Sequence, residues 1–354
     1  MKMESKSPQL SIVMPFYGKK ELVGQMIDSI ITNSFTDWEL LAVDDGSDDA
    51  TRAYLSSYTS DPRIHFIRRE RNPKGATTCR NIGMDQARGE YLIFFDSDDR
   101  ITPTCLQHRV RALQEHPQWD FAIFPSGIIL DDVYRDEPTS TSYGYPIFRD
   151  DIAAFVRRTL PFVVCNCIYR TAALRENGLR WDEQLGSQQD SDFNIHALLS
   201  GLHYGYEPSA PDYGYRIAYS QSTLSSRIRS EAHQESVLHA FRNSYSYVHA
   251  ARGTKYDADL FLGILHLYNF IFTDGINQAF ALRIAQLVEQ HNALHGRLLK
   301  LLISVTLLLG RFLPAKRARQ VPMLPFLLWS RRQEKNKLKH IHKLIKTTPS
   351  YTQP

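Results

Sequence analysis

Apolar and polar residues alternate in blocks along the first 125 positions of the chain. Five apolar runs have the length of a strand: residues 10–16, 38–43, 64–67, 91–95 and 121–125. The segments between them carry apolar side chains three and four positions apart. In residues 21–31, for example, Leu22 and Met26 show the spacing of a helix that faces a core. This alternation of strands and helices predicts an α/β fold with a mostly parallel sheet.

The pattern changes in the second half of the chain. Residues 131–145 are polar and rich in turn formers, which predicts a surface loop. From about Arg227 onward the strand pattern disappears and helical spacing dominates. We expect two domains with these bounds: a sheet domain at residues 1–228, made of a part at 9–125 and a part at 126–228, and a helical region at 229–354.

The composition indicates a folded protein with reduced cysteines. The 354 residues are 43% hydrophobic and 23% charged, which excludes an intrinsically disordered chain. Four cysteines are too few for a disulfide scaffold, and the spacing of Cys165 and Cys167 puts both on one buried face of a predicted strand at residues 162–169. We find no secretory signal and no apolar run of the ~18 residues that a membrane span needs, so we expect a cytoplasmic protein.

Charge is distributed unevenly along the chain. The net charge is +4, but residues 297–354 hold thirteen Lys and Arg against the single acid Glu334, so this tail carries +12 and the body −8. Two apolar stretches, residues 298–313 and 321–329, lie among these cations. Apolar segments flanked by cations are typical of chains that lie on an anionic membrane surface. A helical cap with a solvated basic face and a nucleic-acid tail are the alternatives, and we expect no nucleic-acid partner.

Two acidic clusters follow predicted strands, at the edge where parallel sheets bind ligands. In the first, Asp96, Asp98 and Asp99 surround Ser97 directly after the run at residues 91–95. Three carboxylates in four residues repel one another, and a divalent cation makes such a cluster favourable. Mg²⁺ and Mn²⁺ prefer oxygen ligands and often share them with a substrate diphosphate. A solvated acidic turn is the alternative.

The second cluster consists of Asp44 and Asp45, which end the run at residues 38–43. A carboxylate at this place can accept hydrogen bonds from the N–H groups of a base or from ribose hydroxyls. Gly46 permits the tight turn that follows. The alternative is an ordinary turn in which Ser47 caps the next helix.

Aromatic and basic residues lie near both clusters. Pro15, Phe16 and Tyr17 close the first strand, where an aromatic ring can flank a nucleobase or, as the alternative, pack in the core. Arg80 lies in the predicted helix before the acidic triplet. An arginine there can bind a phosphate or hold a carboxylate in place, and a plain structural ion pair is the alternative.

Taken together and in this order, these features resemble glycosyltransferase family 2. The matching stretches are residues 11–17, 38–49, 72–75, 79–83 and 87–99, and a thinner likeness continues to about residue 225. The resemblance implies a GT-A catalytic domain, which is a Rossmann-like α/β unit with a mostly parallel mixed sheet, followed here by a C-terminal helical extension. It also implies that a sugar is transferred with inversion from a nucleotide-diphosphate sugar, with Mn²⁺ or Mg²⁺ as cofactor.

By this resemblance the donor is held at the edge of the sheet. Asp44 would contact the base or ribose. Asp96 and Asp98 would form the D-x-D pair that faces the metal and the sugar diphosphate, with Asp99 in support. Arg216 lies in a segment that resembles the family's closing segment, which can cover the diphosphate. The expected donor-binding residues are Pro15, Phe16, Tyr17, Asp44, Asp45, Arg80, Asp96, Ser97 and Arg216, and the expected metal ligands are Asp96 and Asp98.

The family also has a Glu-Asp pair at the start of a later helix, and the matching residues here are Gln189 and Asp190. By the resemblance, Asp190 is the general base that takes the proton from the acceptor hydroxyl. Gln189 replaces the usual Glu, which lowers the negative charge near Asp190. Ser187 and Asp190 also fit a helix cap, and Asp192 is the second candidate for the base.

We therefore expect an inverting, metal-dependent glycosyltransferase. The donor would be UDP-linked and the acceptor a hydroxyl of a glycan or lipid-linked glycan, in surface polysaccharide or lipopolysaccharide synthesis. A lipid-linked acceptor agrees with a tail on the inner face of the cytoplasmic membrane. One alternative is a catalytically degenerate, membrane-associated binding protein, which only Gln189 supports, and another is an Asp-dependent phosphotransferase. A dinucleotide oxidoreductase is disfavoured because no Gly-x-Gly-x-x-Gly follows the first strand.

Overall fold

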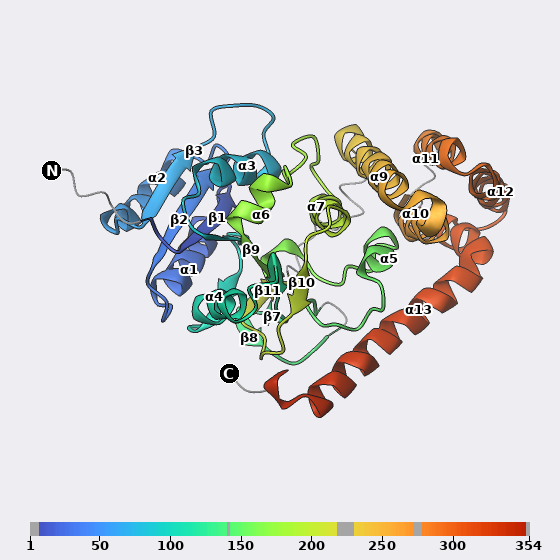
Figure 1. The fold of residues 1–354 in the computed structure, drawn as a ribbon. Coiled ribbons are helices and arrows are strands. Elements are labelled where there is room, and N and C mark those ends of the chain that lie inside the picture. The colour runs from blue at the N-terminus through green and yellow to red at the C-terminus, as the bar shows by residue number, and fades with distance from the viewer. Residues whose placement is uncertain (1–6, 140–141, 218–229, 272–277, 352–354) are drawn as a thin grey trace.

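The structure is a computed structural model that describes residues 7–139, 142–217, 230–271 and 278–351 (Figure 1). We refer to the described residues up to 217 as the sheet domain and to those from 230 onward as the helical region. The expected boundary between residues 228 and 229 lies outside the described residues. Figure 1 shows the sheet domain on one side and the helical region on the other, with α13 running back toward the sheet domain.

The main sheet of the sheet domain has seven strands in the order β10-β6-β9-β4-β1-β2-β3. Its strands are β1 (Leu10–Phe16), β2 (Trp38–Asp44), β3 (Ile64–Arg68), β4 (Tyr91–Phe94), β6 (Phe121–Ile123), β9 (Cys167–Arg170) and β10 (Tyr204–Tyr206). The pairs β1–β2, β1–β4, β2–β3 and β6–β10 are parallel, while β9 runs antiparallel to both β4 and β6. The sheet is therefore mixed and mostly parallel, which confirms the predicted fold class.

Helices connect these strands as the hydrophobic spacing predicts. The helices of the sheet domain are α1 (Lys20–Ile31), α2 (Asp49–Leu55), α3 (Ala76–Gln86), α4 (Cys105–Glu115), α5 (Asp151–Val156), α6 (Thr171–Glu176) and α7 (Gln189–Leu199). Short 3₁₀ turns occur at Ser56–Ser60 and Val164–Asn166. The α3 helix lies very close to β1, because a Cβ atom added at Gly83 would be 2.4 Å from Val13 Cγ1. This close approach holds α3, and with it Arg80, at the edge of the sheet.

A second, four-stranded sheet covers the end of β4 and was not foreseen from the sequence. Its order is β5-β11-β7-β8, with β5 at Arg100–Ile101, β7 at Ser126–Leu130, β8 at Val133–Arg135 and β11 at Tyr213–Arg216. Residues 131–145 were predicted to be a surface loop, and β8 lies within them. The short strand β5 follows the acidic triplet directly and pairs with β11, so this sheet supports the triplet from behind.

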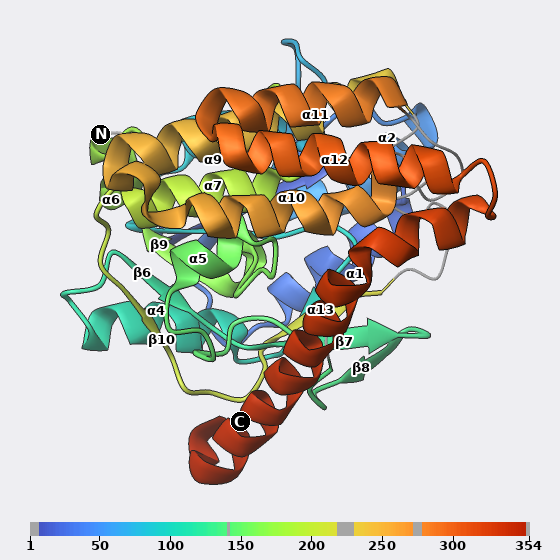
Figure 2. The ribbon, with the colours of Figure 1, turned by 90° about the vertical axis from the view of Figure 1, so that its right-hand side faces the viewer.

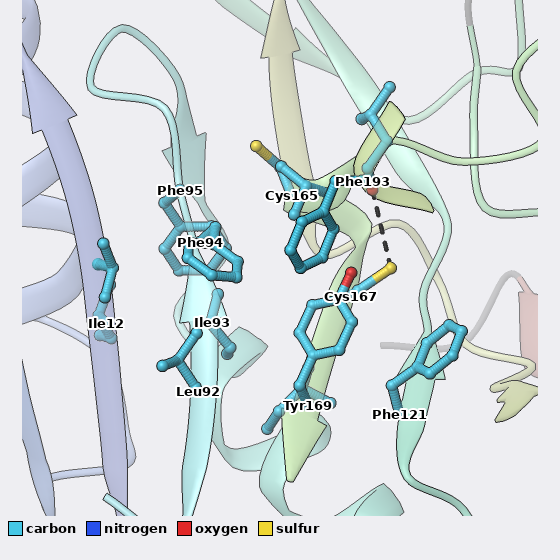
Figure 3. Packing of buried hydrophobic residues seen from close by; sticks show 14 of the residues in the cluster. Ile12, Leu92, Ile93, Phe94, Phe95, Phe121, Cys165, Cys167, Tyr169 and Phe193 are labelled. Atoms are coloured by element: carbon cyan, nitrogen blue, oxygen red, sulfur yellow. Dashed lines mark hydrogen bonds between the residues drawn. The ribbon is translucent and has the colours of Figure 1, made fainter. Parts of the chain in front are cut away.

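The core of the sheet domain is rich in aromatic side chains (Figure 3). Phe94 on β4 contacts Trp181 and Phe193 with ring centroids 5.3 and 5.9 Å apart, and Trp181 stacks on Phe193 at 4.4 Å. Each such pair adds about 0.5–1.5 kcal/mol beyond the burial of its area. Phe94 comes two residues before Asp96, and Phe193 comes three residues after Asp190. This packing therefore fixes the acidic triplet and the start of α7 relative to each other.

The cysteines are buried, as expected, but one is placed differently from the prediction. All four cysteines are free and buried. The strand predicted at residues 162–169 begins only at Cys167, because residues 164–166 form a 3₁₀ turn. Cys165 lies in that turn, so it does not share a strand face with Cys167. The turn is stabilised by Asn166, whose side chain accepts a hydrogen bond of 2.9 Å from the N–H of Val163.

The helical region contains five helices within the described residues. They are α9 (Glu231–Arg252), α10 (Asp257–Ile271), α11 (Gln278–His291), α12 (Ala293–Leu309) and α13 (Ala315–Thr347). Figure 2 shows α9 to α12 lying together, with the long α13 running away from them across the molecule. These helices share a core of their own, built from residues such as Phe241, Ile284 and Ile303. At the far end of α13, Ile341 and Tyr351 pack against Tyr145 of the sheet domain.

Candidate active site

The acidic triplet lies where β4 leaves the sheet. Asp96 and Asp98 are partly exposed, with 35% and 36% of their side chains accessible. Asp96 Oδ1 accepts a hydrogen bond of 2.7 Å from Arg80 Nη2, and Asp98 Oδ2 accepts one of 2.9 Å from Lys19 Nζ. Each carboxylate is thus paired with a cation and still reaches the surface, which leaves both able to meet a ligand.

Asp99 has a different environment from its two neighbours. It is buried, and it accepts hydrogen bonds from the Tyr213 hydroxyl and from the Arg216 N–H, the latter at 2.6 Å. Burial raises the pKa of Asp99 well above its usual range, and the charges of Asp96 and Asp98 add to the effect. Asp99 therefore supports the triplet from the side of β11 and does not face the open edge.

Arg216 is fully engaged in contacts within the protein. Its Nε donates to the Asp98 carbonyl at 2.6 Å, Nη1 donates to Asp132 Oδ1 at 2.8 Å, and Nη2 donates to Gln25 Oε1 at 3.0 Å. The first bond holds the backbone of the acidic triplet, and the other two fix the guanidinium against Asp132 and Gln25. Phosphate binding by Arg216 stays a prediction, and it requires some of these bonds to be exchanged.

The second acidic cluster follows β2. Asp44 Oδ1 accepts bonds from the N–H groups of Gly46 and Ser47 at 3.1 and 2.7 Å, while Oδ2 is buried and has no hydrogen-bond partner within the described residues. Asp45 Oδ1 accepts 2.6 and 3.0 Å bonds from Arg69 Nε and the Gly75 N–H. Arg52 Nη1 lies 3.8 Å from Asp44 Oδ2, which offsets its charge but makes no hydrogen bond. Because a buried carboxylate oxygen without a hydrogen bond is costly, Asp44 Oδ2 is suited to receive an N–H or O–H group of a ligand.

The first strand contributes one exposed aromatic side chain to this edge. Phe16 is buried and meets Phe66 edge-on at 6.1 Å, and Pro15 is also buried in β1. Tyr17 is 57% exposed, with the Lys74 ammonium 3.7 Å from the centre of its ring. Of the three predicted residues, Tyr17 is the one with a ring face accessible to a base, and the other two pack in the core.

Arg80 connects the acidic triplet to the start of α7. It is buried, its guanidinium lies 4.4 Å from the Trp181 ring, and its Nη1 donates a 2.8 Å bond to Gln189 Oε1 while Nη2 donates to Asp96. The sequence indicated an arginine near the carboxylates. It did not indicate that Gln189 is the second acceptor. The only available signal was the departure from the family's Glu at position 189.

Asp190 lies in the first turn of α7, next to this connection. It is half-buried, and its Oδ1 accepts a 3.1 Å bond from the Val164 N–H. Burial raises the pKa of Asp190; the Arg80 charge opposes this increase, and the Asp96 charge adds to it. A carboxylate with a raised pKa binds a proton more strongly, which is the property that a general base needs.

The second candidate for the base, Asp192, is buried and contacts the helical region. Asn243 on α9 donates bonds of 2.9 Å to Asp192 Oδ1 and 2.8 Å to Asp182 Oδ2, and His239 also contacts Asp182 at 2.6 Å. Burial raises the pKa of Asp192 to about 6. These contacts give Asp192 a role in joining α7 to α9, so Asp190 is the better placed of the two for contact with an acceptor.

The carboxylates fit a metal that is shared with a substrate. Within the described residues, no three His, Cys, Asp or Glu side chains are grouped so that they would hold a metal ion by themselves. Asp96 and Asp98 offer two partly exposed carboxylates, and Asp99 is occupied elsewhere. Mg²⁺ is usually bound by one or two carboxylates together with substrate phosphates. The residues present therefore match that mode of binding.

An α/β domain with a mostly parallel sheet, an acidic triplet after β4 and a second small sheet behind it has the GT-A fold of sugar transferases. Residues 11–178 match the model of the family described as glycosyl transferase family 2. The match spans slightly less than half of the chain and lies entirely within the sheet domain, which is therefore similar to the catalytic domains of that family.

Individual relatives agree with this assignment. The chain is 27% identical over 194 residues to the poly(ribitol-phosphate) beta-N-acetylglucosaminyltransferase TarS of Staphylococcus aureus, covering 54% of this chain and 33% of TarS. It is 38% identical over 90 residues, 25% of this chain and 35% of the relative, to the UDP-Glc:alpha-D-GlcNAc-diphosphoundecaprenol beta-1,3-glucosyltransferase WfgD of Escherichia coli. The chain thus spans about a third of the length of these two relatives.

A solved structure shows the same fold over most of the chain. The crystal structure of Staphylococcus aureus TarS 1–349 in complex with UDP-GlcNAc aligns with a TM-score of 0.62 and 20% identity. The alignment covers 89% of this chain and 90% of that one. At this level of identity the likeness concerns the fold, and it includes part of the helical region as well as the sheet domain.

Proposed function

We propose that this protein is an inverting glycosyltransferase that uses a nucleotide-diphosphate sugar, UDP-linked, as donor. The acceptor is a hydroxyl of a glycan or lipid-linked glycan in cell-surface polysaccharide or lipopolysaccharide synthesis. The names of the relatives support this proposal, because they describe N-acetylglucosaminyl transfer to poly(ribitol-phosphate) and glucosyl transfer to a diphosphoundecaprenol-linked sugar. The observation that carries it is the bridge made by Arg80, which brings Asp96 and the start of α7 into one site.

In this mechanism Asp190 takes the proton from the acceptor hydroxyl. The hydroxyl oxygen attacks the anomeric carbon of the donor, the bond from that carbon to the diphosphate breaks, and one displacement inverts the configuration. Arg80 keeps its positive charge beside Asp96 and keeps Gln189 in place. The general base Asp190 therefore stays fixed relative to the donor edge, by which we mean the edge of the sheet that carries Asp44, Asp96 and Asp98. Such positioning removes much of the entropic cost of bringing two substrates together.

Other residues of this chain hold the donor. Asp44 Oδ2 accepts a hydrogen bond from the base or ribose, and the ring of Tyr17 flanks the base. Asp96 and Asp98 would hold a Mn²⁺ or Mg²⁺ ion, which would neutralise negative charge on the leaving diphosphate. Lys19 Nζ donates a 2.9 Å hydrogen bond to Asp98 Oδ2, so its positive charge lies beside the proposed metal site.

We further propose that the protein works on the inner face of the cytoplasmic membrane and contacts it with α12 and the first half of α13. Eight large apolar side chains there are exposed: Leu294, Leu298, Leu301, Leu308, Phe312, Val321, Leu324 and Leu328. Exposed cations, among them Arg311, Lys316 and Arg317, lie beside them. Within the described residues, no helix combines the length and apolar character needed to cross a bilayer. An anionic lipid surface complements both the apolar and the basic groups.

A donor screen tests the enzymatic part of the proposal. The full chain is incubated with Mn²⁺ and one nucleotide sugar at a time, and release of the free nucleotide is measured without any acceptor. We expect slow release from one UDP-linked sugar and none from the same sugar when Mn²⁺ is replaced by a chelator. Failure to bind or hydrolyse every nucleotide sugar would favour a degenerate binding protein instead.

A further inference from the structure

A cavity of about 460 Å³ lies between the sheet domain and the helical region. The sheet domain contributes residues 157–160 after α5 and the start of α7, while α9, α10 and α13 supply the other walls. The α10 helix packs against both α5 and α13, and α7 packs against both α5 and α9. Pockets that hold small molecules have volumes of about 300–1,000 Å³, so this cavity is large enough for one.

The cavity opens beside the candidate base. Gln188 and Ser191 line it, and they lie on either side of the pair Gln189–Asp190 in sequence. Gln189 turns the other way, because its Oε1 accepts from Arg80 at the donor edge. Asp190 therefore stands between the donor edge and the cavity, at the place where an acceptor hydroxyl must meet the donor.

The chemistry of the cavity wall is both apolar and cationic. Apolar side chains such as Leu160, Val237 and Trp329 form much of the surface. Arg158 and Lys337 bring positive charge from opposite sides. Among the lining residues Glu334 is the one acid, while Arg157, a third cation there, is already paired with Asp259.

Arg158 in particular is a half-buried cation with no carboxylate at ion-pair distance within the described residues, and the Asp192 charge acts on it only from farther away. Its guanidinium lies 4.3 Å from the centre of the Phe241 ring, and Nη2 donates a 3.2 Å bond to Ser244 Oγ. Its Nε and Nη1 are buried without a hydrogen-bond partner, and no carboxylate within the described residues lies at ion-pair distance from it. A buried charge without a counter-ion is costly, so the site is suited to an anion that arrives with a ligand.

From this arrangement we propose that the cavity binds the phosphoryl group of a lipid-linked acceptor, with Arg158 and Lys337 facing the phosphate and the apolar wall contacting the adjoining hydrocarbon. The sugar end of the same acceptor then reaches Asp190 past Gln188 and Ser191. The α13 helix joins the two environments of such a molecule, since Leu328 is exposed while Trp329 and Lys337 line the cavity. This inference rests on the proposed function, because it names where the acceptor of that reaction binds.

Binding of farnesyl diphosphate to the full chain tests the inference, with calorimetry or Trp fluorescence as the readout. We expect farnesyl diphosphate to bind at least tenfold more tightly than inorganic pyrophosphate or farnesol, which carry only one of its two parts. Arg158→Gln and Lys337→Gln should each weaken its binding by about tenfold, the loss expected for one charge-assisted hydrogen bond. The second variant keeps the test valid if the first does not fold, as judged by thermal melting.

Arg242→Gln is the matched control, because Arg242 lies next to Phe241 on α9, is exposed and does not line the cavity. Equal binding by the Arg158, Lys337 and Arg242 variants would overturn the inference, and so would equal binding of farnesol and farnesyl diphosphate. Equal binding of pyrophosphate and farnesyl diphosphate would assign the site to a free phosphate and would also overturn it. Nucleotide release by the unmodified chain tests the proposed function separately, since it requires no acceptor.

Discussion

The two sides of Asp190 balance their charges in different ways. On the donor side, acids are paired with cations one by one: Asp45 with Arg69 at 2.6 Å, Asp96 with Arg80 at 2.7 Å and Asp98 with Lys19 at 2.9 Å. On the cavity side, Arg158 has its Nε and Nη1 atoms buried, and no carboxylate lies at ion-pair distance from it within the described residues, although the Asp192 charge acts on it from farther away. A ligand that meets Asp45, Asp96 or Asp98 must exchange partners with an existing ion pair. An anion on the cavity side would instead become the counter-ion of Arg158.

This contrast has a consequence for binding. Replacing one ion pair by another changes the free energy little. A ligand on the donor side would therefore gain most if it arrived with a metal ion of its own, such as Mg²⁺ on a diphosphate. The cavity side needs no metal, because its buried cation gains a counter-ion directly. The donor and the proposed acceptor both carry phosphate, and this difference would keep them in separate places.

The largest effect is expected from removing the group between the two sides. Asp190→Asn should lower the transfer rate by about 10³-fold, because an amide cannot take the acceptor proton. Donor affinity should stay within about threefold, since Asp190 does not contact the donor edge cations by hydrogen bonds. Rates are measured with saturating donor, and donor affinity by calorimetry.

Asp192→Asn is the comparison for that experiment. It lies two residues away and contacts Asn243 at 2.9 Å, so its loss should lower the melting temperature more than the rate. If the Asp192 variant lost transfer and the Asp190 variant kept it, the assignment of the base would be wrong.

A second prediction concerns metal-dependent donor binding on the donor side alone. Asp98→Ala should weaken binding of the UDP-linked donor in Mn²⁺ by about 100-fold, because the metal loses a carboxylate ligand, and should have little effect on donor binding in a chelator. Titration of Mn²⁺ against donor binding measures this. Asp131→Ala, which removes an exposed carboxylate outside the acidic triplet, is the control. An unchanged dependence on Mn²⁺ in the Asp98 variant would contradict the metal assignment.

A third prediction concerns the exposed apolar side chains of α12 and of the turn that follows it. Replacing Leu308 and Phe312 together with serine should weaken binding to vesicles rich in anionic lipid by at least tenfold, because burying each side chain contributes about 1.5–3 kcal/mol. Flotation of the full chain with such vesicles measures the effect. Val133→Ser removes an exposed apolar residue from the opposite domain and should leave flotation unchanged. Equal flotation of all three proteins would exclude this surface as the contact.

The smallest effect is a shift in pH dependence. Transfer needs Asp190 without its proton, so the rate should fall as the pH falls through the pKa of Asp190, which burial raises. Gln189→Glu adds a negative charge beside Asp190 and should raise this pKa further, moving the acid limb of kcat/KM upward by about 0.5–1 pH unit. A shift to lower pH would show that Gln189 does not act on Asp190 through charge.

The sequence predicted the strands and turns that carry the acidic residues because these features are local. An apolar run followed by acids, as at Phe94 to Asp98, encodes a strand and the turn that ends it within a few residues. The strand–helix alternation and the helical character after residue 230 are confirmed for the same reason. Helix propensity and hydrophobic spacing act over single turns, so they can be read without knowledge of distant contacts.

The features that the sequence did not predict depend on contacts between distant residues. Arg80 meets Gln189 across 109 positions, and Arg158 and Lys337 share a cavity although 179 positions separate them. The strand β11 forms only because β5 and β7 pair with it. In the tail, α13 continues through Pro322 and Pro325, which local rules treat as helix breakers. Hydrophobic spacing carries no information on such pairings.

The contact of Ile341 and Tyr351 with Tyr145 fastens the far end of α13 to the sheet domain, so α13 connects that domain to the other helices. The ring centres of Tyr145 and Tyr351 are 5.6 Å apart, and the Lys337 ammonium lies 5.0 Å from the centre of the Tyr143 ring. Cutting away the tail would therefore expose Tyr145 and remove one wall of the cavity, in addition to the apolar surface of α12 and α13. If the two proposals above hold, a shortened chain would lose lipid contact and acceptor selection together, so solubility gained by truncation would come with an altered choice of substrate.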